Sequence, residues 1–187
     1  MNPEMLENEY LEPLKTEMQA PIFATFWSRM VAIFIDGLVF LPAAYISLQN
    51  MLSGKIFGIE VIITFLWIFY KIFMEWKYQG TIGKLLMKIK VVNESGQGIT
   101  LEQSIVRFAF YFLRYMGLLM LSYHMFAKPA FAEVHSIEEL MVFYENQQEI
   151  VSSIVSLPLI ISINFVIFDI RKQALHDKLA KTFCIYS

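Results

Sequence analysis

The chain has 187 residues, of which 57% are hydrophobic and only 17% are charged, and its mean hydropathy is +0.52. Because ordinary soluble domains carry about 25% charged residues, this composition indicates an integral membrane protein and excludes a soluble globular domain. The length allows one membrane domain with short loops, and the net charge of −2 identifies no class of partner. The single cysteine, Cys184, excludes an intrachain disulfide.

Residues 1–25 are expected to form an acidic cytoplasmic tail without a folded domain of its own. This segment contains five glutamates, one lysine and three prolines. It lacks the positively charged region with which a secretory signal peptide begins, so we expect the first apolar segment to be retained. The remaining residues, 26–187, are expected to form one transmembrane domain.

Four apolar segments are expected to cross the membrane, at residues 27–48, 57–76, 108–127 and 150–170. A helix of about 20 apolar residues is needed to span the hydrocarbon core. The third segment is the least regular, because Arg107 and Arg114 lie seven residues apart on one helix face. An interfacial helix is the alternative there. The predicted fold class is an all-α membrane protein with a four-helix transmembrane bundle.

The loop between the second and third segments is basic and is predicted to lie on the membrane surface. Residues 81–88 have the pattern of a short amphipathic helix, and Lys84, Lys88 and Lys90 are expected to contact anionic headgroups. Residues 89–92 alternate as a strand does, a turn sequence follows, and residues 99–101 could pair back. We therefore expect a small cytoplasmic β-hairpin between helices 2 and 3.

The distribution of lysine and arginine predicts the orientation of the chain. In the four-span arrangement, only Lys55 and Lys128 fall in loops on one side, and nearly all other basic residues fall at or near the opposite side. Loops rich in lysine and arginine stay in the cytoplasm. Both termini and the basic loop are therefore expected to be cytoplasmic, and the glutamate-rich segment at residues 128–149 is expected to face outward.

Asp36 is the first candidate functional residue, because it lies within the first apolar segment. It follows Arg29 by seven residues, so the two side chains share one helix face. A carboxylate at this depth costs about 2.5–3.5 kcal/mol on insertion scales. Asp36 could be a buried anion that holds helices together. Alternatively, it could be a cation or proton site, with Arg29 and Arg114 setting its pKa.

Other chemistry finds little support in the sequence. The three histidines have no metal-ligand spacing, and no nucleophilic triad or metalloprotease motif is present. The glycines at positions 80 and 83 are too close together for a phosphate-binding loop. His176 and Asp177 could be a proton-handling pair or a polar anchor at the membrane surface. We expect no enzymatic activity, metal, cofactor or nucleic-acid partner.

Several short segments, taken in order, resemble the RDD family of bacterial membrane proteins, which is named for one arginine and two aspartates. The resemblance extends over about residues 23–185 and rests on residues 26–36, 80–84, 89–96, 101–107 and 175–182. By this resemblance, Arg29 matches the arginine and Asp36 the first aspartate. Asp177 matches the second aspartate, with Asp169 as the alternative. The resemblance implies a bacterial cytoplasmic membrane.

Two classes of function follow. The small size and the absence of an inverted repeat favour a non-transporting accessory protein that binds or regulates another membrane protein. The buried charge favours the alternative, a small cation/proton antiporter in which Asp36 is the shared carboxylate. The expected partners are the lipid bilayer, a second copy of the chain, or another membrane protein.

Overall fold

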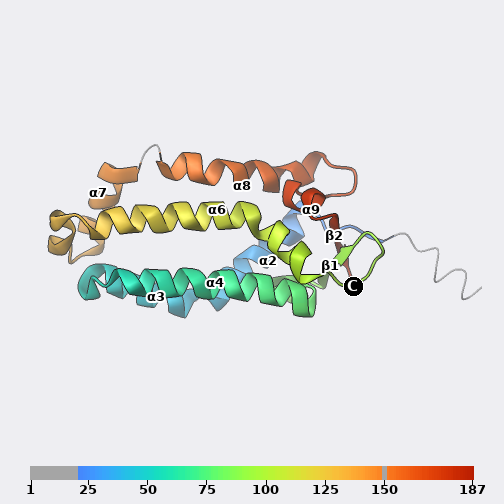
Figure 1. The fold of residues 1–187 in the computed structure, drawn as a ribbon, viewed down its shortest axis with the longest axis horizontal. Helices are drawn as coiled ribbons and strands as arrows, with labels where there is room; N and C mark the ends of the chain where they lie inside the picture. The colour runs from blue at the N-terminus through green and yellow to red at the C-terminus, as the bar shows by residue number, and fades with distance from the viewer. Residues whose placement is uncertain (1–20, 149–150) are drawn as a thin grey trace, which may run out of the picture.

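The computed structural model describes residues 21–148 and 151–187. Long helices lie side by side, and a two-stranded sheet covers one end of them (Figure 1). The helices and strands, in chain order, are α2 (Phe26–Val39), α3 (Leu41–Gln49), a π-helical turn (Asn50–Gly54), α4 (Phe57–Tyr78), α5 (Ile82–Leu86), β1 (Ile89–Asn93), α6 (Leu101–Phe126), a 3-10 turn (Pro129–Glu133), α7 (Ile137–Gln148), α8 (Val151–Phe168), α9 (Leu175–Leu179) and β2 (Thr182–Tyr186).

Within the described residues, α4 and α6 are each long and apolar enough to cross a membrane. The first predicted span is broken into α2 and α3, which meet at an angle of 53° and count as a third span only when taken together. Pro42 at the start of α3 suits this break, because proline cannot continue the hydrogen bonding of a preceding helix. In the part of α8 whose side chains the structure describes, Ser156–Phe168 form a shorter apolar helix. The fourth crossing therefore stays a prediction.

The prediction that residues 89–92 pair with residues 99–101 in a β-hairpin is wrong about the second strand. β1 pairs antiparallel with β2, in a register that runs from Ile89 opposite Tyr186 to Asn93 opposite Thr182. Only an isolated bridge joins Val92 to Gly98.

The capping of α6 explains this difference. The Thr100 hydroxyl accepts a hydrogen bond from the Gln103 backbone N–H at 3.2 Å, and the Gln103 side chain accepts one from the Thr100 N–H at 3.1 Å. This reciprocal cap begins the helix at Leu101. Residues 99–101 therefore do not form the second strand of the predicted hairpin. Residues 182–186 take its place, because their β-branched and aromatic side chains suit a strand.

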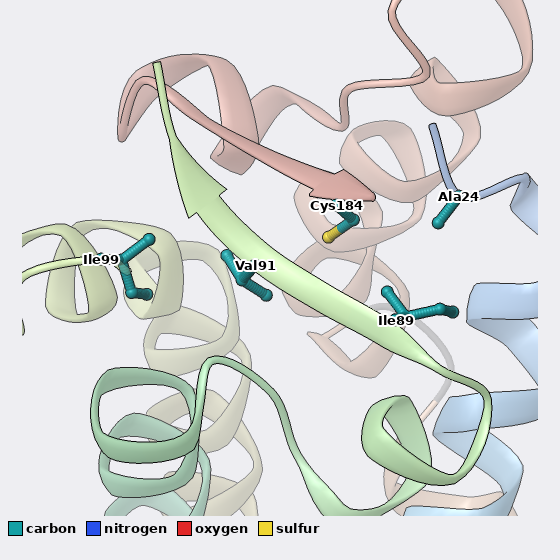
Figure 2. Packing of buried hydrophobic residues seen from close by; sticks show 5 residues of the cluster. All are labelled: Ala24, Ile89, Val91, Ile99 and Cys184. Carbon is teal, nitrogen blue, oxygen red and sulfur yellow. The ribbon is translucent and has the colours of Figure 1, made fainter. Parts of the chain in front are cut away.

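A small buried cluster holds the sheet onto the end of the bundle. Ile89, Val91 and Cys184 lie along one side of the paired strands, with Ala24 at one end and Ile99 at the other (Figure 2). Cys184 is a free, buried thiol. The cluster joins the segment before α2, the loop before α6 and the C-terminal strand, so it fixes the position of α9, which directly precedes that strand.

The short helix α5 packs against α2 at very close range. A Cβ atom added to Gly83 would lie 1.9 Å from the backbone oxygen of Ala32. Both residues are buried, and the obstructing atom belongs to the backbone of a helix. Only glycine can therefore occupy position 83 without displacing one helix from the other.

We predict that Gly83→Ala lowers stability by more than about 3 kcal/mol, because the added methyl group overlaps the α2 backbone. Gly37→Ala is the matched control, since nothing lies within 4 Å of its added Cβ atom. That variant should be neutral or stabilised by about 0.5–1 kcal/mol. Thermal unfolding of the detergent-purified variants, followed by tryptophan fluorescence, measures both effects. Equal melting temperatures for the two variants would contradict the close packing.

Candidate functional site

Asp177, in the first turn of α9, is fully buried between two arginines from other helices. Its Oδ2 accepts a hydrogen bond from Nη1 of Arg29 at 2.6 Å and one from the backbone N–H of Ala174 at 3.1 Å. Its Oδ1 lies 2.6 Å from Nη1 of Arg107 as an ion pair. Two arginines from α2 and α6 thus converge on one carboxylate of α9.

The ion pairs continue from Arg107 to two further helices. Nε of Arg107 donates to Oε2 of Glu75 at 2.9 Å, and Nζ of Lys84 donates to Oε1 of the same glutamate at 2.5 Å. All three side chains are at least nine-tenths buried. Arg29, Asp177, Arg107, Glu75 and Lys84 therefore alternate in sign across α2, α9, α6, α4 and α5. We call these five residues the ion-pair chain.

Lys71 lies beside the ion-pair chain but is not part of it. Its Nζ lies 4.4 Å from the centroid of the Tyr111 ring, a cation–π contact, and the residue is 6% exposed. No carboxylate of the described residues lies within ion-pair distance of this ammonium group. Lys71 and Glu75 lie four residues apart on α4, a spacing that allows an ion pair, but Glu75 is bound by Arg107 and Lys84 instead.

His176 is buried inside the bundle rather than lying at its surface. Nδ1 lies 2.9 Å from the Ser162 hydroxyl, and Nε2 lies 3.3 Å from Oδ1 of Asp177. Burial lowers the pKa of His176 to about 3 despite the opposing attraction of Asp177. Burial acts to raise the pKa of Asp177, but the guanidinium groups of Arg107 and Arg29 hold that pKa well below its usual range. At neutral pH the pair is a neutral imidazole beside a carboxylate.

The structure brings neither Arg29 nor Arg114 to Asp36. Oδ1 of Asp36 accepts hydrogen bonds from the Tyr70 hydroxyl and from the backbone N–H of Gly83, both at 2.8 Å. Arg29 and Asp36 lie seven positions apart, which is about 10 Å along a helix. Arg29 binds Asp177 instead. The Arg114 guanidinium lies 5.9 Å from the centroid of the Tyr115 ring.

The three lysines predicted to contact the membrane surface separate into two groups. Lys84 is buried and bound to Glu75, so its contact with headgroups stays a prediction. Lys88 and Lys90 are exposed at the sheet end. The alternative second aspartate, Asp169, pairs with Lys178 at 2.5 Å near the surface and lies outside the ion-pair chain.

Comparison with known proteins decides the family. The family model described as "RDD family" matches residues 23–181, which is most of the chain. The chain belongs to the RDD family. This RDD protein is also similar to the uncharacterized protein YxaI of Bacillus subtilis (strain 168), with 29% identity over 131 residues that cover 54% of this chain and 85% of that relative. No solved structure matches it significantly.

Sequence reasoning missed two members of the ion-pair chain in this RDD protein. Arg107 was considered only for the helix face it shares with Arg114, and no site was predicted at Glu75. Each had a signal, since arginine and glutamate are rarely buried without partners. Those partners come from α5 and α9, which only the folded chain brings to α4 and α6. Arg29 and Asp177, which the family resemblance assigned to one motif, form an ion pair in the structure.

We predict that Asp177→Asn destabilises the protein by about 3–5 kcal/mol, because it leaves two buried guanidinium groups without a counter-charge. Asp169→Asn removes the more exposed ion pair with Lys178 and should change stability by less than about 1 kcal/mol. The melting temperatures of the two variants in the same detergent measure the difference. A loss for Asp177→Asn no larger than that for Asp169→Asn would contradict a structural role for the ion-pair chain.

Proposed function

We propose that this RDD protein is a non-transporting accessory protein that binds another protein of the bacterial cytoplasmic membrane. The observation that supports this proposal most directly is that lysine and arginine side chains neutralise both carboxylates of the ion-pair chain. Asp177 is held by two arginines, and Glu75 is held by Arg107 and Lys84. A cation carrier needs a buried carboxylate that can exchange its counter-charge. In this cluster the counter-charges are covalent parts of the protein, so the cluster serves to fix the fold.

An open groove at the sheet end supports a binding role. It has a volume of about 200 Å³, and Phe23, Val92, Phe183 and Ile185 supply its apolar lining. Arg171 stands at the groove, with its guanidinium 5.9 Å from the centroid of the Phe183 ring. Apolar grooves with a few polar groups are the usual form of a binding site. Asn93 and Glu94 also line the groove, so it suits a partner segment that carries an apolar side chain flanked by polar ones.

The proposal places both termini and the sheet on the cytoplasmic side, with four crossings of which α8 is the last. Support comes from the lysine and arginine asymmetry of the sequence. Lys88 and Lys90 are exposed at the sheet end, where they can contact anionic headgroups. The acidic helix α7 lies at the opposite end of the bundle (Figure 1). The groove then faces the cytoplasmic domains of neighbouring membrane proteins.

We predict that a photo-crosslinking amino acid at Phe183, which lines the groove, captures one other membrane protein in the native host. The same amino acid at Leu179 is the control, because Leu179 is 62% exposed on α9 and does not line the groove. Mass spectrometry of the adduct identifies the partner. If the adduct contains only this chain, or if both positions give the same products, the accessory proposal is wrong.

The antiporter alternative is favoured by one observation at Asp36. This carboxylate is 2% exposed, and it accepts hydrogen bonds from two neutral donors, the Tyr70 hydroxyl and the Gly83 amide. No lysine or arginine of the described residues forms an ion pair with this carboxylate, so a cation that reached it would not have to displace one. Asp36 is therefore the residue at which the two functions make different predictions.

We predict that the purified protein in proteoliposomes gives no sodium- or potassium-dependent proton flux above that of protein-free vesicles. Asp36→Asn should behave in the same way, because asparagine keeps the oxygen that accepts both hydrogen bonds. A pH-sensitive dye trapped inside the vesicles measures the flux. Exchange by the wild type that is lost in Asp36→Asn would establish the antiporter and overturn the accessory proposal.

A further inference from the structure

A basic cavity lies beside the ion-pair chain, inside the bundle. Its volume is about 30 Å³. Its polar lining consists of Arg29, Lys71, Lys84, Arg107, Tyr111 and His176, and its apolar lining of Ile33, Ile163, Val166 and Ala174. Four basic side chains and no acidic one therefore line it. A smaller neighbouring cavity of about 10 Å³ shares Lys71, Arg107, Tyr111 and His176 with it.

The charges around this cavity do not balance. Glu75 and Asp177 are the two carboxylates bound to its lining, and between them they contact Arg29, Arg107 and Lys84. Lys71 is a fourth base. His176 is neutral at physiological pH, because burial lowers its pKa to about 3. The cavity lining thus has four positive groups against the two carboxylates bound to it. The other buried carboxylates of the described residues, Asp36 and Glu60, line neither cavity. A buried charge without a counter-charge is unfavourable.

Lys71 is the group whose contacts are least complete. It is 6% exposed, and its ammonium contacts the face of the Tyr111 ring. No oxygen of the described residues accepts a hydrogen bond from it, and it lines both cavities. An ammonium group has three N–H donors, and a ring face satisfies them only weakly. The donors of Lys71 are therefore free for an acceptor placed in the cavity.

We propose that the basic cavity binds a phosphate group and that Lys71 is the residue that holds it. A phosphate group carries one or two negative charges, which matches the excess of positive charge, and several oxygens that accept hydrogen bonds. Lysine and arginine side chains both bind phosphate well. A cavity of this size admits about two water-sized groups, so one or two oxygens of a phosphate group fit in it beside Lys71, whereas a bulky organic anion does not.

The phosphate group can come from a lipid or from solution. Ile33 on α2 and Ile163 on α8 form the apolar wall of the cavity, and Ile33 is 36% exposed. A lipid headgroup that entered between these two helices would leave its acyl chains on apolar surface. Inorganic phosphate would fill the same site without that contact. Both ligands use the same chemistry at Lys71, and they are distinguished by the experiment.

The test compares two probes on the full-length protein. In neutral detergent, inorganic phosphate is titrated against chloride at equal ionic strength. In nanodiscs, phosphatidylcholine with phosphatidylglycerol is compared with phosphatidylcholine alone. We expect at least one probe to raise the melting temperature by about 5 °C near saturation. A shift with inorganic phosphate supports a site for the free anion, and a shift with phosphatidylglycerol alone supports a site for the headgroup.

Variants assign the effect to Lys71. Lys71→Met, which keeps most of the length of the side chain and removes the charge, should weaken binding by about tenfold or more. Lys71→Arg keeps the charge and should retain binding. Lys77→Met is the control, because Lys77 lies on the same helix, is exposed and lines neither cavity. The proposal is overturned if neither probe stabilises the wild type, or if Lys71→Met binds as tightly as Lys77→Met. The wild-type result decides the question even if Lys71→Met fails to fold.

Discussion

The carboxylate of Asp177 is the interaction on which the rest of this structure depends. It lies between Arg29 and Arg107, so a single buried acid joins α2, α6 and α9. Arg107 then binds Glu75 and so extends the contact to α4 and α5. Apolar contact alone discriminates weakly between helix arrangements in a membrane, because lipid is as apolar as the helix surfaces. Charges that must be paired provide the missing specificity, since any other arrangement leaves a buried ion alone.

The sequence predicted those parts of the fold that local patterns determine. The long apolar helix α4, expected from the apolar segment at residues 57–76, follows from residues close together in the chain. The partner of β1 could not be found in the same way. A nearby strand competes with a distant one, and the helix that begins at Leu101 removes the nearby strand. The break after α2 could not be predicted either, because the apolar pattern continues through the residues at which the helix changes direction.

The candidate site shows a similar division. The family resemblance assigned Arg29 and Asp177 to one motif, and the structure pairs these two residues across 148 positions of the chain. Lys71 and Glu75 lie four residues apart on one helix, a spacing that allows an ion pair, but bases from α5 and α6 bind that carboxylate instead. The burial of Lys84 could not be predicted from the sequence. A basic amphipathic segment has the same composition whether its lysine binds a lipid headgroup or a glutamate. Local charge patterns identify the ionic residues but not their partners.

The order of the ion pairs along the chain has a consequence for biosynthesis. Arg29 leaves the ribosome 148 residues before its partner, which at about 5–20 residues per second takes roughly 7–30 seconds. Arg107 is likewise made well before α9. During this interval two arginines are in or near the membrane without the carboxylate that later neutralises them. The bundle therefore reaches its final arrangement only when α9 docks and β2 joins β1.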